Sequence, residues 1–392
     1  MAVGIYKSNP AELAPRHMLV FDARLAAGPP PLMPAAAYDF AIFGSTPLAG
    51  LLAGLLATAH HKAVCLVGGA SSAFRLPRAI DLSVSALTRP DSWALLRQTT
   101  PETVKLLGDM HIPRQGVRKV DPIFVAETSE GADALSHMRH LAEGFGIGME
   151  RTQSPAIGGT AYTLQDAVLL HRATVEPAIM AWLAKAGVGL LTGREGSVTI
   201  RRDGSARLEH AGATIEAQHA VLADDAAILA HLEVDERDRT LAVLPAMVIL
   251  TEPTGPLPSP AMLYVDRDVT LMRSRSGAVT GIGIGRTEDA IERIGGCLAG
   301  RGPLRRAGQH VFRTVTTVDG APLVGAARGL KATVLAGLGP SGAFLAPAIA
   351  RRVAGAATEA EQAWFATHEA GRGNARAQAA EFRGGGLLET QH

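Results

Sequence analysis

A run of twenty residues without a charge, residues 40–59, limits most strongly what this chain can fold into. Twenty mostly apolar residues are long enough for a helix that spans a bilayer. One spanning helix would, however, enclose the Gly-Ser-Thr-Pro sequence that begins at Gly44, and glycine and proline weaken helix interiors most. A strand over residues 38–43, a turn at Gly44 and a helix over residues 48–59 explain the run better, because Pro47 then falls where a helix tolerates it. We therefore expect no membrane span.

Further elements follow in an α/β order. A second buried strand over residues 63–67 completes a strand–helix–strand unit, which is typical of parallel sheets. A later block begins with a predicted helix over residues 164–186, which ends before Gly187 as a C-cap glycine requires. The other predicted elements are strands over 18–21, 188–191, 197–202, 206–210, 219–223 and 333–336, short strands between 241 and 285, and helices over 288–299 and 343–354. The α/β blocks are not contiguous, so we expect a nucleotide-binding core interrupted by a second domain.

Composition excludes several classes of function. The 38 basic residues nearly balance the 37 acidic ones, so the chain lacks the positive surface of nucleic-acid binders and of proteins held on anionic membranes. Two cysteines, Cys65 and Cys297, are too few for a disulfide framework, which is typical of the reducing cytoplasm. We expect a cytoplasmic protein with no nucleic-acid partner. We also expect no metal site, because His137 and His140 have no third ligand near them in sequence.

The first candidate nucleotide-binding turn lies at Gly44. A dinucleotide fingerprint G-x-G-x-x-G would place its three glycines at Gly44, Thr46 and Ala49, and only the first is glycine. The second strand is followed by Gly68 and not by the acidic residue that holds a ribose. From these residues alone, a buried strand–helix turn without a ligand explains the segment as well as a cofactor site does.

The second candidate turn lies near the C-terminus. The sequence T-V-D-G-A-P-L-V-G at residues 317–325 is followed by G-L-G-P-S-G at residues 337–342, between a predicted strand and a predicted helix. Glycines in such a turn offer backbone amides, and the following helix N-terminus favours an electron-rich group.

This pair of motifs resembles the C-terminal flavin-binding motif of FAD-dependent oxidoreductases of the D-amino-acid oxidase, glycine oxidase and sarcosine oxidase type. The resemblance extends over about residues 38–355. It implies an α/β fold of the FAD-linked reductase kind, with a Rossmann-like nucleotide domain and a β-rich α+β substrate domain. The implied nucleotide domain comprises residues 38–110, 150–232 and 310–366, and the substrate domain comprises residues 111–149 and 233–309. Residues 1–37 are then an N-terminal extension and residues 367–392 a flexible tail.

The resemblance also implies which residues contact FAD. On the first turn and its neighbours these are Gly44, Thr46, Pro47, Ala49, Gly68 and Asp225, and on the second turn Gly337, Gly339, Ser341, Gly342 and Ala343.

Three positions depart from the family pattern. Thr46 replaces a glycine, Gly68 replaces an acidic residue, and Asp225 stands where a glycine is usual. A carboxylate close to a pyrophosphate is repulsive by roughly 1 kcal/mol or more at contact distance. All three departures lie on the adenosine and pyrophosphate side of the implied site. Phe312 stands where relatives with covalent flavin have cysteine, so we expect any flavin to be non-covalent.

The chemistry that the resemblance implies is removal of a hydride by the flavin from the carbon beside an amine nitrogen, while the protein positions a small amine or amino acid. The candidate catalytic residues are Arg313, which lies one position from where relatives bind a substrate carboxylate, and Tyr264 and Arg273, on strands that would face the flavin. Ordinary alternatives are an exposed salt-bridge arginine for Arg313 and a half-buried core tyrosine for Tyr264.

Two hypotheses about function therefore stay open. The C-terminal motifs favour an FAD-dependent oxidoreductase that acts on CH–NH groups. The substitutions at Thr46, Gly68 and Asp225 favour an accessory subunit derived from a flavoprotein. Such a subunit would have lost FAD binding and would have a protein partner in a larger assembly.

Overall fold

The computed structural model of the chain describes residues 37–68, 75–154, 157–191, 196–210, 212–232, 240–301, 304–327 and 329–370. The predicted extension with its strand at 18–21, apart from residue 37, and the predicted tail beyond residue 370 lie outside these residues. Among the helices in the described part of the chain, none is both long and apolar enough to cross a membrane.

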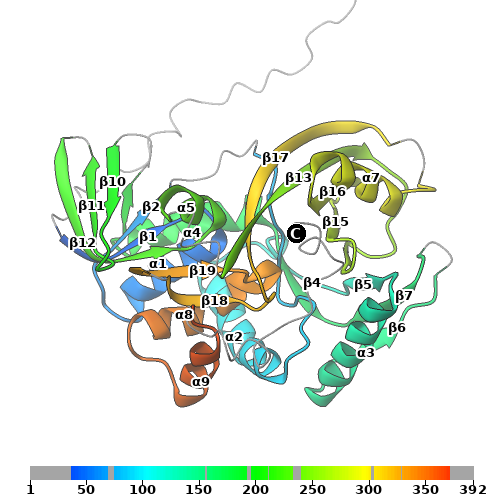
Figure 1. Cartoon of the computed structure of the whole chain (residues 1–392), viewed down its shortest axis with the longest axis horizontal. Helices are drawn as coiled ribbons and strands as arrows, with labels where there is room; N and C mark the ends of the chain where they lie inside the picture. Colours follow the sequence, from blue (N-terminus) through cyan, green and yellow to red (C-terminus); the bar gives the residue numbers. More distant parts are fainter. Residues whose placement is uncertain are drawn as a thin grey trace, which may run out of the picture.

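The first sheet has a parallel core around β1 (Ala37–Phe43), visible on the left of Figure 1. On one side β1 pairs with β12 (Ala213–Leu222), and on the other with β2 (Val64–Val67), which in turn pairs with β9 (Gly189–Leu191). All four residues of β2 are buried, as expected for a strand covered on both faces. The strands that extend this core are β19 (Leu330–Ala336), β18 (Leu323–Ala327), β11 (Ala206–His210) and β10 (Gly196–Ile200). This arrangement confirms the expected Rossmann-like α/β core.

Helices cover both faces of this sheet. On one face, α1 (Pro47–Thr58) packs against α4 (Arg172–Lys185) and α8 (Ala346–Val353). Gly54 allows α1 and α4 to pack closely, because a Cβ at that position would lie 2.0 Å from the ring of Trp182. The opposite face is covered by α5 (Asp225–His231), whose Ile228 is fully buried among apolar residues of β1 and β12.

A second, mostly antiparallel sheet fills the right half of Figure 1, where its two longest strands arch over the molecule. In spatial order its strands are β17 (Arg306–Thr317), β13 (Leu241–Pro253), β16 (Ala278–Ile284), β15 (Val269–Arg273), β14 (Ala261–Tyr264), β5 (Ile123–Ala126), β7 (Thr160–Leu164) and β6 (Met149–Arg151). Against it pack α7 (Thr287–Cys297) and α3 (Ser129–Gly144). One cluster of buried side chains continues from Ile42 of the first sheet to Phe312 of the second.

A small third sheet and two helices complete the description. The sheet consists of β3 (Asp81–Leu82), β8 (Ala167–Leu170) and β4 (Val117–Val120). The helices are α2 (Pro90–Asp109) and α9 (Glu359–Thr367), which contact each other beside α8.

Two predicted helices differ in the structure. Residues 164–171 are not helical, because Asp166 takes a left-handed turn (φ 60°) and the four apolar residues after it form β8; the helix begins only at Arg172. The predicted helix over 343–354 is confirmed from Ala346 to Val353 as α8, whereas residues 343–345 belong to the 3₁₀ helix η2 (Gly339–Leu345) that leads into it.

The strands in the middle of the chain are longer and joined differently than expected. Thirteen residues form the single strand β13, where short strands were predicted. Both β7 and β17 pair within the second sheet, although the predicted boundaries give residues 150–164 and 310–317 to the nucleotide domain. Residues 367–370 of the predicted tail belong to the folded part, because His368 is buried and its carbonyl accepts a hydrogen bond from the Val324 N–H. The domain boundaries stay a prediction.

Candidate cofactor site

The first candidate turn joins the carboxyl ends of three parallel strands. The Gly44 N–H donates to the carbonyl of Val67 at 3.0 Å, and the Ala223 N–H donates to the carbonyl of Phe43 at 2.8 Å. Gly44 has φ 155°, a conformation that favours glycine. The predicted turn and helix are therefore confirmed, at the sheet edge where ligands bind in this architecture.

Gly68 closes this turn from the side of β2. A Cβ at Gly68 would lie 2.5 Å from the carbonyl oxygen of Gly44, and the residue has φ 152°. An acidic side chain at this position would require the turn to move. The close approach of the Gly44 and Gly68 backbones thus explains why no ribose-binding carboxylate stands at position 68.

A carboxylate of the chain itself occupies the turn. One oxygen of Asp224, Oδ2, accepts hydrogen bonds from the Ser45 N–H at 2.7 Å and from the Ser45 Oγ at 3.4 Å. The other, Oδ1, accepts from the Ala227 N–H at 2.9 Å, so that Asp224 is also the N-cap of α5. The hydroxyl of Thr46 accepts from the Ala49 N–H at 3.4 Å and caps α1. Amides of the turn and of the first helical turn are therefore bonded within the chain.

Asp224 and its neighbour Asp225 have different partners. Asp225 is turned toward β17, where its carboxylate accepts a hydrogen bond from the Thr314 hydroxyl at 2.7 Å, and burial raises its pKa. The sequence pattern singled out Asp225 as the carboxylate closest to a pyrophosphate. The structure gives the contact with the turn to Asp224, because β12 ends one residue earlier and Asp224 becomes the cap of the following helix.

Two arginines interact electrostatically with this pair of carboxylates. Burial and the nearby Arg75 lower the pKa of Arg78, an effect that the charges of Asp224 and Asp225 oppose. The guanidinium of Arg78 lies over the ring of Phe312, 5.5 Å from its centroid. Arg172 lies close enough to Asp224 for an electrostatic interaction. No motif marked either arginine in the sequence, because each comes from a segment without a recognisable pattern.

Arg172 is itself held by a buried ion pair. Its guanidinium donates two hydrogen bonds to Asp81, at 2.5 Å and 3.2 Å, from the start of α4 to β3. The Asp81 side chain is 8% exposed. Burial is the largest single effect and lowers the pKa of Arg172, but the charge and hydrogen bonds of Asp81, together with the charges of Glu176 and Asp224, raise it overall.

The second candidate turn forms one unit with the motif that precedes it. Strands β18 and β19 pair so that Leu323 faces Ala336, which places residues 317–322 beside Gly337. A Cβ at Gly337 would lie 3.2 Å from the methyl group of Thr317, whose hydroxyl donates to the Ala321 carbonyl at 2.6 Å. Gly337 and Gly339 both have left-handed conformations, with φ 66° and 55°. The two motifs are therefore adjacent in space as well as in sequence.

A cavity of about 160 Å³ lies against this unit. Ligand sites for whole cofactors are usually larger, about 300–1,000 Å³, so the cavity has room for one end of such a ligand. Its lining comes from the two motifs, from the loop before α2, and from α2 and α9: Ser85, Ala86, Leu87, Ser92, Leu96, Gly320, Pro322, Gly337, Leu338, Gly339, Ser341, Leu345 and Trp364. Of the predicted cofactor residues, Gly337, Gly339 and Ser341 are brought together here, while Gly342 and Ala343 are buried in η2 behind them.

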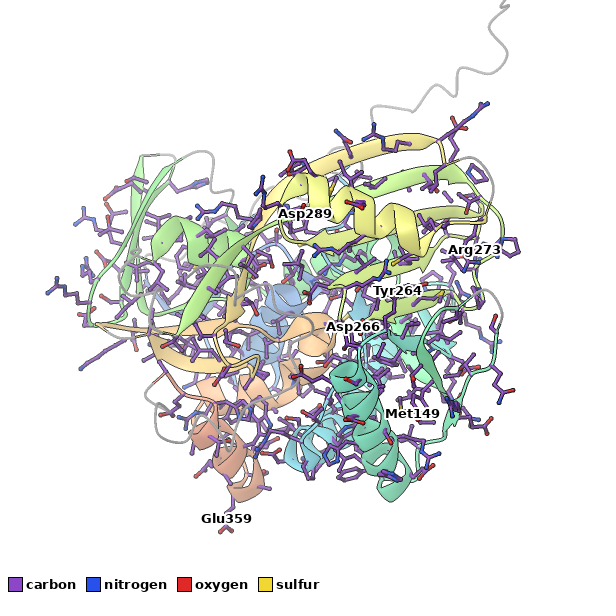
Figure 2. The ribbon with its side chains drawn as sticks, turned by 45° about the vertical axis from the view of Figure 1, so that its right-hand side comes forward. Met149, Tyr264, Asp266, Arg273, Asp289 and Glu359 are labelled. Atoms are coloured by element: carbon purple, nitrogen blue, oxygen red, sulfur yellow. The ribbon has the colours of Figure 1, made fainter. Side chains whose placement is uncertain are left out.

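The three candidate catalytic residues are not brought together at this cavity. Arg313 is exposed on β17, on the face opposite to the buried Phe312. Tyr264 is 5% exposed and packs with Cys297 beneath α7, where burial raises its pKa to about 12. Arg273 ends β15, and Figure 2 shows it at the outer edge of the second sheet. Their predicted role in substrate binding stays a prediction.

The two turns differ in how well they fit FAD. At the second turn, glycines with left-handed backbone border an open cavity, which suits a flat ring bound through backbone amides. At the first turn the amide of Ser45 is of the kind that binds phosphate, but it is already bonded to Asp224. The first turn therefore fits a pyrophosphate only after Asp224 has given up its bond to Ser45.

Solved structures match this fold, whereas no protein-family model and no curated protein sequence matches the chain. Glycine oxidase from Geobacillus kaustophilus matches with a TM-score of 0.64 and 17% identity, over 84% of this chain and 98% of that one. L-Proline dehydrogenase from P. horikoshii matches with a TM-score of 0.65 and 14% identity, over 83% and 96% of the two chains. Iminodiacetate oxidase from Chelativorans sp. BNC1 matches with a TM-score of 0.59 and 14% identity, over 81% and 94%. The chain thus has the fold of oxidases and dehydrogenases of this kind.

Proposed function

We propose that this chain, which has the fold of glycine oxidase and L-proline dehydrogenase, is an FAD-dependent oxidoreductase that oxidises a small amine or amino acid. The observation that carries the proposal is the unit formed by residues 317–325 and 337–342, which borders a cavity with left-handed glycines. The fold alone would not suffice, because one fold can support many functions.

The names of the matching proteins support the class of substrate. In glycine, L-proline and iminodiacetate, the amine nitrogen and a carboxylate are attached to the same carbon. When bound, FAD supplies a hydride acceptor, so that the carbon–nitrogen single bond of the substrate becomes a double bond as hydride and proton leave. The residues at the second turn would hold the ring end of the cofactor, and the continuous apolar cluster up to Phe312 would keep water from it.

We propose that the flavin is held without a covalent bond. Both cysteines are buried, and burial raises the pKa of Cys65 to about 12 and that of Cys297 to about 11, so neither is a reactive thiolate. Unfolding the FAD-loaded protein in guanidinium chloride and filtering it should release all flavin absorbance into the filtrate. Flavin retained with the chain would contradict a non-covalent site.

Anaerobic mixing tests the activity directly. The FAD-loaded protein is mixed with a panel of amino acids and secondary amines, and the visible absorbance of oxidised flavin is followed. We expect at least one carboxylated amine to bleach the flavin. The hydroxy acids that carry a hydroxyl in place of the amine should leave it oxidised. A fully loaded protein that no amine reduces would contradict the proposed activity.

A second function is favoured by one specific observation, the bond between Asp224 and the Ser45 amide. A chain whose first turn is permanently closed in this way would serve as an accessory subunit without FAD, bound to a protein partner. The distinguishing result is the flavin content of the folded chain at saturating FAD, which this second function expects to be zero.

A further inference from the structure

We propose that Asp224 competes with the pyrophosphate of FAD for the β1–α1 turn and thereby limits how tightly the chain holds its cofactor. The inference rests on the proposed function and names the residue that regulates its cofactor site. Three features of the described residues carry it: the bonds of Asp224, the space around Gly44, and the charges near the carboxylate.

The bonds of Asp224 are those that a phosphate would make. Backbone amides at the start of a helix bind anions, and in dinucleotide-binding folds the pyrophosphate lies at the turn after the first strand. Here the Ser45 amide donates to Asp224 at 2.7 Å, a distance typical of a charge-assisted hydrogen bond. The chain therefore supplies an anion of its own to the amide that the cofactor would need.

The space at the turn is also taken by this side chain. A Cβ at Gly44 would lie 3.2 Å from Oδ2 of Asp224, so the carboxylate packs directly against the glycine backbone. In a dinucleotide fingerprint the first glycine makes this tight turn, directly beside the backbone that a pyrophosphate approaches at the second position, Thr46 in this chain. A phosphate and the Asp224 carboxylate cannot occupy this space together, and their charges repel each other.

The positive charges near Asp224 favour an anion at this place, whether it is the Asp224 carboxylate or a pyrophosphate. Arg78 and Arg172 both interact electrostatically with Asp224. If the Asp224 charge is removed, both arginines stay, because Asp81 holds Arg172 and Phe312 packs under Arg78. A neutral residue at position 224 therefore removes one negative charge from beside the turn amides while both arginines stay in place, which favours a pyrophosphate.

The experiment compares three ligands on the wild-type chain and two variants. D224N removes the charge and keeps the shape, and D224S keeps a good helix cap with a shorter side chain. Dissociation constants are measured for FAD, for ADP, which carries the pyrophosphate without the ring, and for riboflavin, which carries the ring without phosphate. The control is D203N, because Asp203 is an exposed turn residue that loses the same charge and whose carboxylate accepts its hydrogen bonds from Ser205 in its own turn.

The proposal expects D224N and D224S to bind FAD and ADP about tenfold or more tightly than the wild type, because one charged hydrogen-bond acceptor has been removed from the site. Riboflavin affinity should stay within about twofold, and D203N should match the wild type for all three ligands. Circular dichroism and thermal melting of each variant show that the comparison is made on folded chains. D224S serves as the test if D224N fails to fold.

Three results would overturn the proposal, and they differ in what they say of the proposed function. Tight FAD binding by the wild type with no gain in the variants removes the role of Asp224 and leaves the FAD enzyme intact. An equal gain for riboflavin and ADP means that position 224 acts on the whole fold and not on the pyrophosphate. Absence of FAD and ADP binding in the wild type and both variants removes the inference and the proposed function together.

Discussion

The carboxylate of Asp224 accepts a hydrogen bond from the backbone amide of Ser45 at 2.7 Å, although the two residues are 179 positions apart. The bond links the end of β12 to the turn after β1, and the same carboxylate caps α5. One side chain thus joins three elements at the sheet edge where the fold binds its ligands.

This relationship predicts a loss of stability when the side chain is truncated. D224A removes the helix cap and the bond to Ser45 and should lower the free energy of unfolding of the FAD-free protein by about 2–3 kcal/mol. D224N keeps an acceptor of the same shape and should cost about 1 kcal/mol or less. Denaturant unfolding of both variants measures the difference, and a D224A chain as stable as the wild type would show that the bond does not hold the turn.

A second prediction concerns the contact between the two glycines of the turn. G68A places a Cβ 2.5 Å from the Gly44 carbonyl oxygen at a residue with φ 152°, and should destabilise the chain by about 1–3 kcal/mol. The control is G108A, because Gly108 lies in α2 with no atom within 4 Å of the added methyl group. Alanine there should be neutral or stabilise by about 0.5–1 kcal/mol. Equal melting temperatures for the two variants would contradict the account of this turn.

The buried pair of Arg172 and Asp81 gives a third prediction. D81N leaves the Arg172 charge without its buried counter-ion and should lower the free energy of unfolding by about 3–5 kcal/mol. The pair of Lys119 and Asp166 is a suitable control, because both side chains are at least 70% exposed. Its D166N variant should change stability by less than about 1 kcal/mol. Chemical denaturation that shows the same small effect for both variants would mean that Arg172 is solvated.

Asp268 gives a prediction about pH. Burial raises its pKa from 3.8 to about 7, partly opposed by the charge of Arg293. In the unfolded chain the carboxyl ionises near its ordinary pKa, so the folded state binds more protons between about pH 4 and 7. The stabilising contribution of the protonated form is present below about pH 4 and is lost as the pH rises through 7.

D268N measures this contribution. The free energy of unfolding of the wild type, relative to D268N, should fall by about 2–4 kcal/mol from pH 4 to 7 and then stay constant. Asparagine accepts the left-handed backbone of this residue (φ 50°), so the substitution leaves the turn intact. D289N, at an exposed residue of α7 labelled in Figure 2, is the control and should show no such pH-dependent difference. A parallel pH profile for wild type and D268N would contradict the prediction.

The sequence was sufficient to predict the parallel core and the second turn. Apolar runs without alternation identified β1 and β2, and the glycine spacing at 337–342 identified the turn beside β19. Local patterns failed where tertiary contacts decided the conformation. The apolar residues of β8 have a spacing that also suits a helix, and only their burial between β3 and β4 makes them a strand.

The partners of the first turn could not be predicted. Asp224 and Ser45 meet only because β12 folds back beside β1, and nothing in the sequence says which of two adjacent carboxylates turns inward. For the same reason Arg78 and Arg172 were not recognised. Arg313 and Tyr264 were chosen by resemblance, and neither lines the cavity at the second turn.

Binding of FAD underlies the proposed function and the role of Asp224, and equilibrium dialysis of the wild-type protein against increasing FAD measures it. We expect saturable binding of one FAD per chain, with incomplete occupancy when the protein is purified without added cofactor, because Asp224 occupies the turn. Folded wild-type protein that retains no FAD at saturating concentration would contradict this expectation and leave the accessory-subunit function.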